Sequence, residues 1–209
     1  MVDKISSWKY VEEFASEPDA ITRARMRAEE FGVECITASV GSHLALVAGA
    51  MGAKAIVEAG TGTGVSGLWL LSAAPDAVLA TIDIEPEHQA AAKVAFTEAG
   101  IKAARTRVIS GRAIDVMSNM ADAAYDLVFL DADRETVEDQ LHQAARLLRP
   151  GGVVALAHVL WRDRVPDPAM RDESTAIYRD IIRYFKQSDA FVSALSPIGD
   201  GLLLASRLQ

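Results

Sequence analysis

The sequence of 209 residues is poor in cysteine and in aromatic residues. Its single cysteine, Cys35, excludes an intramolecular disulfide and a cysteine-based zinc cluster, and a lone cysteine is usually a small buried residue. Aromatic residues make up 6% of a chain that is 50% hydrophobic, and alanine supplies much of the apolar fraction. This composition supports a sizeable core of closely packed helices and argues against an aromatic-rich β-sandwich.

Basic charge and long apolar runs are scarce as well. The formal net charge is -8, whereas a nucleic-acid-binding surface needs a basic patch, so no nucleic-acid partner is expected. The longest apolar run, 44–51, is far too short to cross a bilayer, and residues 1–16 lack the apolar stretch of a signal peptide. We therefore expect a cytoplasmic protein with no membrane partner.

The chain changes its pattern after Gly52. The residues before it are predicted to be helical, with Asp19 as the cap of a helix that ends near Gly32 and a second helix over 38–51. After Gly52, short apolar runs alternate with longer amphipathic stretches, which is the βαβ signature of a doubly wound parallel sheet. The predicted strands are 55–57, 78–82, 106–109, 125–130 and 153–157, and the predicted helices are 65–74, 87–99, 113–120 and 135–148.

The end of the chain departs from this alternation. Two apolar segments, 191–195 and 202–206, are joined by a turn over 197–201, which predicts an antiparallel strand pair at one edge of the sheet. We expect a single α/β structural domain, in which residues 1–52 form an N-terminal helical extension packed on a core of residues 53–209.

A glycine-rich segment follows the first predicted strand, at the edge where doubly wound sheets bind ligands. The sequence Val57-Glu58-Ala59-Gly60-Thr61-Gly62-Thr63-Gly64 ends this strand and opens a helix. Glycine lets the backbone turn tightly and approach a ligand closely, and the start of a helix presents free N–H groups. Asp83 ends the second strand, where a carboxylate commonly bonds ribose hydroxyls. A nucleotide-like cofactor is therefore the expected ligand.

The glycines alone do not name this cofactor. Gly62, Gly64 and Gly67 match the dinucleotide pattern G-x-G-x-x-G, so an NAD-dependent oxidoreductase is one alternative. Against it, the glycine series begins earlier, at Gly60, and Glu58 would repel a pyrophosphate but suit the ammonium group of S-adenosylmethionine. The sequence also lacks a Tyr-x-x-x-Lys pair for hydride transfer. A role of the glycines in packing alone is a second alternative.

The glycine loop and the later strand ends together resemble the small class I O-methyltransferases, the group of catechol and caffeoyl-CoA O-methyltransferases. The resemblance covers about residues 37–207. It rests on the segments 57–66, 81–87, 130–134, 149–153 and 159–161. It implies a doubly wound, mostly parallel seven-stranded sheet with the last strand pair reversed, and a homodimer. It also implies S-adenosylmethionine as the cofactor and methyl transfer to a hydroxyl of a small, aromatic acceptor.

By this resemblance, the cofactor contacts lie along the carboxyl edge of the sheet. The glycine loop with Ser66 would hold the methionine part, Asp83 the ribose, and Ile84 the adenine. Asp133 would lie near the amino group, and Val40 would close over the methionine end; either aspartate is alternatively a helix cap. The full predicted set is Val40, Glu58, Gly60, Thr61, Gly62, Ser66, Asp83, Ile84, Gly111, Arg112, Ala113, Asp131 and Asp133.

The catalytic machinery of the family is only partly present. The resemblance implies a divalent cation, Mg²⁺ or Mn²⁺, held by an Asp after the fourth strand and an Asp-Asn pair after the fifth, with a nearby Lys as base. Here the first ligand is Asp131, but Ala157 and His158 replace the pair, and Arg134 replaces the Lys. Ala157 offers no ligand atom, Mg²⁺ prefers oxygen ligands, and arginine does not act as a base. Whether a cation binds is therefore left open, with Asp131 as its remaining predicted ligand.

Without a metal, His158 is the candidate general base, because imidazole titrates near neutral pH; alternatively it is a strand-end histidine bonded to backbone. Arg134 is expected to hold an anionic substrate group or to pair with Asp131. Asp131 and Trp161 are the predicted substrate contacts, with Trp161 either stacking on a planar acceptor or anchoring its loop. His43 is the histidine expected nearest the cofactor mouth. A catalytically impaired S-adenosylmethionine-binding protein is the alternative to an active enzyme.

Overall fold

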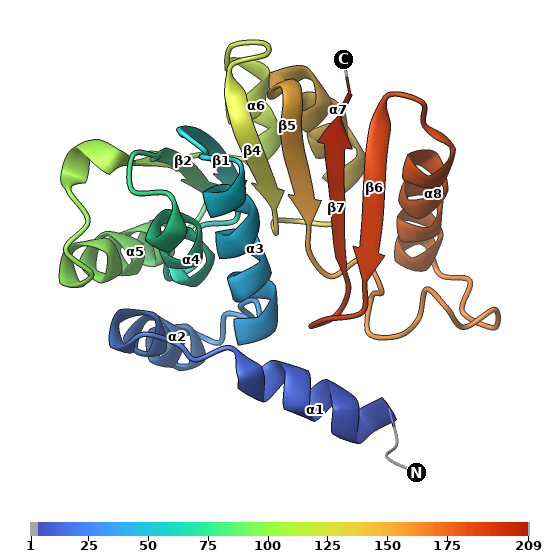
Figure 1. Cartoon of the computed structure of the whole chain (residues 1–209), viewed down its shortest axis with the longest axis horizontal. Helices are drawn as coiled ribbons and strands as arrows, with labels where there is room; N and C mark the ends of the chain where they lie inside the picture. The colour runs from blue at the N-terminus through green and yellow to red at the C-terminus, as the bar shows by residue number, and fades with distance from the viewer. Residues whose placement is uncertain (1–3, 209) are drawn as a thin grey trace.

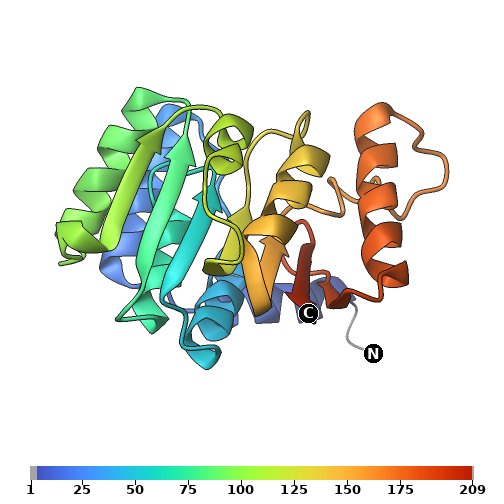
Figure 2. The same ribbon diagram turned by 90° about the horizontal axis from the view of Figure 1, so that it is seen from above.

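The computed structural model describes residues 4–208 and contains one sheet with helices on both faces (Figures 1 and 2). The strands are β1 (Ala55–Ala59), β2 (Val78–Asp83), β3 (Thr106–Ser110), β4 (Tyr125–Leu130), β5 (Leu148–Leu156), β6 (Phe191–Ser196) and β7 (Leu202–Arg207). The helices are α1 (Lys4–Phe14), α2 (Asp19–Phe31), α3 (Ala38–Ala50), α4 (Val65–Ala73), α5 (Pro86–Glu98), the 3₁₀ turn η1 (Ala103–Arg105), α6 (Ala113–Ser118), α7 (Val137–Leu147) and α8 (Glu173–Gln187).

The seven strands lie in the order β3-β2-β1-β4-β5-β7-β6. Neighbours among β1 to β5 pair in parallel, whereas β7 pairs antiparallel with both β5 and β6. The predicted mostly parallel, doubly wound α/β sheet with a reversed C-terminal strand pair is therefore confirmed.

Two apolar layers cover the two faces of the sheet. Helices α2 to α5 pack on one face around residues such as Leu70 and Phe96, and α6 to α8 pack on the other around Met117 and Leu147. Parallel strands joined by helical crossovers are buried on both faces, which explains why the strand runs are apolar without alternation. Helix α1 lies outside these layers and packs on α3 (Figure 1).

The strand order reverses between β1 and β4, and this reversal positions the site. The residue after β4 is hydrogen-bonded to the end of β1, because the N–H of Asp131 donates to the carbonyl of Ala59 at 2.9 Å. On the other side of β4, the N–H of Ala157 donates to the carbonyl of Leu130 at 3.2 Å. The carboxyl ends of β1, β4 and β5 thus meet at the place where doubly wound sheets bind ligands.

Some expectations from the sequence need correction. Strand β5 begins at Leu148 rather than residue 153, because Tyr125 still pairs with Leu148 before a register shift in the sheet. Helix α8 was not expected at all; Asp172 caps it by accepting a hydrogen bond from the N–H of Thr175. Asp19 is the first residue of α2 and makes no side-chain cap bond, since Pro18 holds the cap position.

The proposed division at residue 52 stays a prediction. The first three residues of the range 1–52 and the last residue of 53–209 lie outside the described residues. Between residues 4 and 208, no helix has the length and apolar character needed to span a membrane.

Candidate active site

The glycine loop after β1 is pressed against the end of β4. Gly60 has a φ of +94°, and a β-carbon at this position would lie 2.1 Å from the carbonyl oxygen of Asp131. A residue with a side chain is excluded on both counts, because the backbone conformation favours glycine and the added carbon would overlap main chain. The loop therefore depends on Gly60 to bring the start of α4 beside the end of β4.

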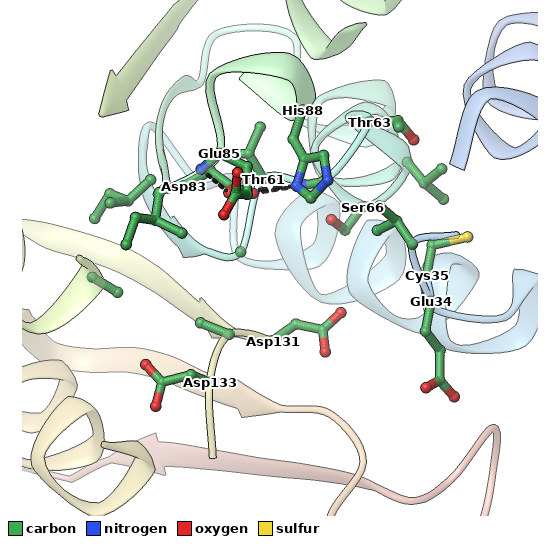
Figure 3. A pocket seen from close by; sticks show the side chains of 18 of the residues that line it. Glu34, Cys35, Thr61, Thr63, Ser66, Asp83, Glu85, His88, Asp131 and Asp133 are labelled. Atoms are coloured by element: carbon green, nitrogen blue, oxygen red, sulfur yellow. Dashed lines mark hydrogen bonds and ion pairs between the residues drawn. The ribbon is translucent and has the colours of Figure 1, made fainter. Parts of the chain in front are cut away.

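A cavity of about 390 Å³ opens in front of this loop. It is bounded by the glycine loop, the ends of β2 and β4, the start of α6 and the segment between α2 and α3 (Figure 3). The predicted cofactor residues that line it are Gly60, Thr61, Gly62, Ser66, Asp83, Ile84, Gly111, Arg112, Ala113, Asp131 and Asp133. The fold thus gathers eleven of the thirteen predicted cofactor residues around one cavity.

Asp83 lies at the centre of one wall of this cavity. Its carboxylate accepts hydrogen bonds from the N–H of Gly62 at 2.8 Å and from the N–H of Glu85 at 2.9 Å. His88 Nδ1 lies 3.5 Å from the same carboxylate (Figure 3). The contact with Gly62 fixes the glycine loop to the end of β2, so Asp83 has a structural task besides any contact with a ligand.

Glu58 and Val40 are absent from the residues that line the cavity, and the cofactor contacts expected for them stay predictions. Glu58 is fully buried beneath the loop, where Ser66 Oγ and Thr81 Oγ1 each donate to its carboxylate at 2.6 Å. Burial raises the pKa of Glu58 to about 7, against the opposing effect of the two hydroxyl hydrogen bonds. Val40, on α3, is also buried and belongs to the hydrophobic core. Glu58 supports the loop from behind.

Ten further lining residues were not predicted as cofactor contacts, and His88, Glu34 and Cys35 are among them. His88 comes from α5, while Glu34 and Cys35 come from the segment between α2 and α3 (Figure 3). Cys35 is partly exposed rather than fully buried, and Arg25 Nη1 donates to its sulfur at 3.0 Å. His88, and not the expected His43, is the histidine that lines this cavity, and His43 Nδ1 bonds the carbonyl of Ser39 on its own helix.

A second cavity of about 490 Å³ adjoins the first, between the ends of β4 and β5 and the N-terminal part of α8. Both cavities are lined by Glu34, Asp131, Ala132 and Asp133. Burial raises the pKa of Asp131 to about 6, and the nearby His158 opposes this shift. Asp131 therefore lies at the junction of the two cavities.

His158 lies between two carboxylates in the second cavity. Its Nε2 is 3.4 Å from Asp131 Oδ1, and its Nδ1 is 3.5 Å from Asp200 Oδ2. Asp200 belongs to the turn between β6 and β7, and it was not predicted as a site residue. The predicted edge hairpin was the one signal available, because it brings this turn beside the carboxyl end of β5.

Trp161 and Arg134 form one wall of the second cavity together with Tyr178 of α8. The Trp161 ring stacks on Tyr178 at 5.5 Å between centroids, and the guanidinium of Arg134 lies 5.0 Å from the Trp161 centroid. Among the described residues Arg134 makes no ion pair with Asp131, contrary to one expectation, because His158 takes that place. Trp161 thus contacts both neighbours and also lines the cavity.

Asp133 is not the cap residue of α7, a position that Thr136 holds. Its two carboxylate oxygens accept from the N–H and the hydroxyl of Thr136, both at 2.9 Å, just before α7. The side chain nevertheless lines both cavities. These hydrogen bonds to Thr136 and a cofactor contact are compatible, because each carboxylate oxygen has two lone pairs.

The chain is similar to known proteins over most of its length. A family model described as O-methyltransferase matches residues 19–208. The chain belongs to the O-methyltransferase family. A Mycobacterium ulcerans protein named "Putative O-methyltransferase" is 49% identical over 193 residues, which is 92% of this chain and 86% of the relative.

Solved structures agree with this family assignment. A Corynebacterium glutamicum protein has a TM-score of 0.88 and 32% identity, and the match covers 96% of this chain and 94% of the other. The O-methyltransferase TomG of Streptomyces achromogenes, involved in tomaymycin synthesis and solved in complex with SAM, has a TM-score of 0.85 and 27% identity over 100% of both chains. The resemblance to S-adenosylmethionine-dependent O-methyltransferases is confirmed, and the nicotinamide alternative is not supported.

The residues of this O-methyltransferase do not fit the divalent cation of its family. Ala157 has no donor atom, and the two ring nitrogens of His158 face different carboxylates instead of converging with Asp131 on one point. Residues 4–208 contain no group of three or more His, Cys, Asp or Glu side chains arranged to hold a metal ion. Hard cations such as Mg²⁺ prefer oxygen ligands, whereas one of the two donors here is an imidazole nitrogen.

Proposed function

We propose that this O-methyltransferase transfers the methyl group of S-adenosylmethionine to a hydroxyl of a small, aromatic acceptor. The observation that carries the proposal is the meeting of two cavities at Asp131. One has the glycine loop and the strand-end carboxylate typical of a nucleoside site, and the other has aromatic and titratable walls. The family match and the cofactor complex of the Streptomyces relative support the choice of cofactor.

The first cavity would hold the cofactor. Asp83 would accept the ribose hydroxyls, with Ile84 and the start of α6 beside the adenine and Thr61 and Ser66 toward the methionine part. When bound, S-adenosylmethionine supplies an electrophilic methyl group on a positively charged sulfur. The nearby carboxyl groups of Asp131 and Asp133 suit the cationic end of this cofactor.

The second cavity would hold the acceptor. Trp161 and Tyr178 offer an aromatic wall to a planar molecule, and Arg134 offers a cation to an acidic substituent. His158 would take the proton of the acceptor hydroxyl while the C–O bond forms and the C–S bond breaks. The products are the methyl ether, S-adenosylhomocysteine and one proton, so no further reactant is needed.

Calorimetry and a turnover screen test this proposal. S-adenosylmethionine is expected to bind and NAD is not, and catechols and related phenols are expected to be methylated. His158→Ala should lower kcat at least 100-fold without changing cofactor affinity, because general base catalysis is typically worth about 10²–10⁴-fold. The matched control is His142→Ala, an exposed histidine on α7. Binding of NAD alone contradicts the cofactor, and cofactor binding without turnover favours the catalytically impaired alternative.

We also propose that the protein forms a homodimer through α1. This helix exposes large apolar side chains, among them Ile5 (75%), Tyr10 (75%) and Phe14 (83%). Clustered exposed apolar residues are typical of protein–protein contacts. Sedimentation should detect a dimer that Phe14→Glu dissociates, whereas Val94→Glu on α5, where the wild-type side chain is 47% exposed, should leave it intact. A monomeric wild type contradicts the homodimer.

A cytoplasmic location stays a prediction from composition.

A further inference from the structure

We propose that Gln140 is a specificity-determining residue, which selects acceptors that carry a second hydrogen-bond donor besides the hydroxyl that is methylated. This inference rests on the proposed methyl transfer and deepens it, because it names the substrate class of the second cavity. Gln140 lines that cavity, and neither the proposed cofactor contacts nor the proposed proton transfer to His158 uses it.

The second cavity combines exposed charged side chains with a buried, mostly apolar surface. Its exposed lining residues include Glu34, Glu135 and Arg162. The lining residues that are themselves buried are Leu130, Val137, Gln140, Leu156, Ala157 and Tyr178. Gln140 is only 1% exposed, so its amide belongs to this buried surface. The part of an acceptor that enters deepest therefore meets apolar side chains and this amide.

The start of α7 holds the nitrogen of this amide. Gln140 lies in the first turn of the helix, four residues after Thr136. Side chains on a helix lean toward its N-terminus, and residues four apart share one face. Nε2 of Gln140 accordingly donates to Thr136 Oγ1 at 2.9 Å and to the carbonyl of Asp133 at 3.4 Å. The amide N–H₂ is therefore directed to the segment before α7.

These partners also decide which end of the amide is the oxygen. A backbone carbonyl only accepts hydrogen bonds, and the Thr136 hydroxyl already donates to Asp133 Oδ2 at 2.9 Å. Both groups therefore need a donor from Gln140. A reversed amide would set its oxygen against the carbonyl of Asp133, where two acceptors would face each other. The Gln140 oxygen is thus the end that is turned away from these partners.

The oxygen of Gln140 is buried without a hydrogen-bond partner among residues 4–208. Nearly all buried polar groups in proteins are paired, so an exception of this kind needs an explanation. Gln140 lines the second cavity and its N–H₂ is already bonded, which leaves Oε1 to pair with a bound molecule. An amide oxygen only accepts, so the group that it binds is an O–H or an N–H.

This pairing defines a class of acceptor. The hydroxyl that is methylated gives up its proton in the proposed reaction, so the donor to Gln140 is a second hydroxyl or an amino group. A fluoro, methoxy or carboxylate substituent at the same place offers no proton and would leave Oε1 unpaired. A site built to bond a donor discriminates against analogues that lack it, because its buried polar group then stays unsatisfied.

Matched pairs of phenols test this selection. Catechol, resorcinol and hydroquinone carry a second hydroxyl at the ortho, meta and para positions, whereas 2-, 3- and 4-fluorophenol carry a small group that does not donate. Wild type should prefer the hydroxyl member in kcat/KM, and Gln140→Met, which has no amide oxygen, should lower this preference about fivefold or more in at least one pair. A smaller change in all three pairs would overturn the assignment.

A comparison variant separates the oxygen from the packing around it. Gln140→Met also removes the N–H₂ contacts with Thr136 and Asp133. Thr136→Val takes away one of these contacts and leaves the Gln140 oxygen in place, so it should retain the wild-type preference within each pair. Loss of the preference in Thr136→Val as large as in Gln140→Met would mean that the start of α7, and not the oxygen, is responsible.

Binding to wild type gives a test that needs neither a variant nor turnover. NMR titrations with the same phenols, in the presence of S-adenosylhomocysteine, should give a lower Kd for the hydroxyl member of at least one pair. The side-chain N–H₂ signals of Gln140 should shift with that phenol. Equal Kd values within every pair, or no binding of any of these phenols, would overturn the assignment. If wild type methylates no acceptor, the proposed function fails, whereas these Kd values still decide the role of Gln140.

Discussion

The two cavities that meet at Asp131 are built in different ways. The first is shaped mainly by backbone: a glycine loop pressed on the end of β4 and held to β2 by Asp83. The second is shaped by side chains from distant segments, with Arg134 after β4, His158 and Trp161 after β5, and Tyr178 on α8. The backbone-built cavity follows the family pattern, whereas the side-chain-built cavity departs from it.

This difference indicates which of the two cavities tolerates amino-acid substitutions. A backbone cradle depends on glycine at positions where any side chain would collide, so substitution there is costly. A wall of side chains can exchange one chemistry for another without moving the strands. The proposed cofactor cavity should therefore respond to mutation by losing cofactor binding, and the proposed acceptor cavity by a change in turnover rate or acceptor affinity.

Gly60→Ala should have the largest effect. The added carbon would lie 2.1 Å from the Asp131 carbonyl oxygen, so the loop or the end of β4 must move. We expect a loss of about 3 kcal/mol or more in the free energy of unfolding and no measurable cofactor binding. The control is Gly100→Ala, where φ is +71° but nothing lies within 4 Å; it should cost only about 1 kcal/mol. If urea unfolding gives both variants the same loss in free energy of unfolding, the overlap with the Asp131 carbonyl is not the cause of the loss.

Asp83→Ala should come next. Removing the carboxylate takes away the proposed ribose acceptor and leaves the N–H groups of Gly62 and Glu85 without their partner. Hydrogen bonds to charged groups are worth about 1.5–3 kcal/mol, so calorimetry should record a cofactor affinity lowered roughly 10- to 100-fold. Asp76→Ala, an exposed aspartate before the other end of β2, should leave affinity unchanged. Undiminished affinity in Asp83→Ala would refute the ribose assignment.

Glu58→Gln should change how the free energy of unfolding depends on pH, because Glu58 lies buried behind the backbone-built cavity. Because the folded-state pKa is raised to about 7 from 4.5, the folded protein keeps a proton that the unfolded chain releases between these values. The stabilising contribution is thus complete below about pH 4.5 and is lost as the pH rises through 7. Relative to the variant, wild type should lose on the order of 1–3 kcal/mol between pH 5 and 8.

Urea unfolding at several pH values measures this difference for Glu58→Gln and wild type. Glu87→Gln, which changes an exposed carboxyl group at the start of α5, is the control and should follow the wild-type curve. Parallel curves for wild type and Glu58→Gln would show that Glu58 is ionised throughout this range in the folded protein.

Trp161→Ala should have the smallest effect. The ring contributes one wall of the proposed acceptor cavity, and aromatic contacts are worth about 0.5–1.5 kcal/mol beyond their buried area. We expect an acceptor KM raised roughly 3- to 10-fold in steady-state kinetics, with cofactor affinity unchanged. Trp161→Phe keeps an aromatic ring on Tyr178 and should recover most of the loss. A large fall in kcat would instead mean that Trp161 acts on His158 through the turn.

Prediction from the sequence was strongest where the signal is local. The apolar runs predicted the strands, because strands buried on both faces need continuous apolar sequence. The glycine series predicted the loop, and Ala157 and His158, in place of the family's ligand pair, made a metal site doubtful. Helix α8 was missed, although Asp172 and Thr175 form its start and it supplies Tyr178 to the acceptor wall.

The sequence by itself determined the sheet, the cofactor loop and the loss of the metal pair, since each depends on residue type at a fixed spacing. Only the tertiary structure decided that Glu58 lies buried behind the loop and that Asp200 meets His158. These are contacts between segments far apart in the chain, and their geometry follows from how the hairpin and the strand ends pack. No local pattern encodes such a distance, so the glycine loop was predictable from residue spacing and the carboxylates around His158 were not.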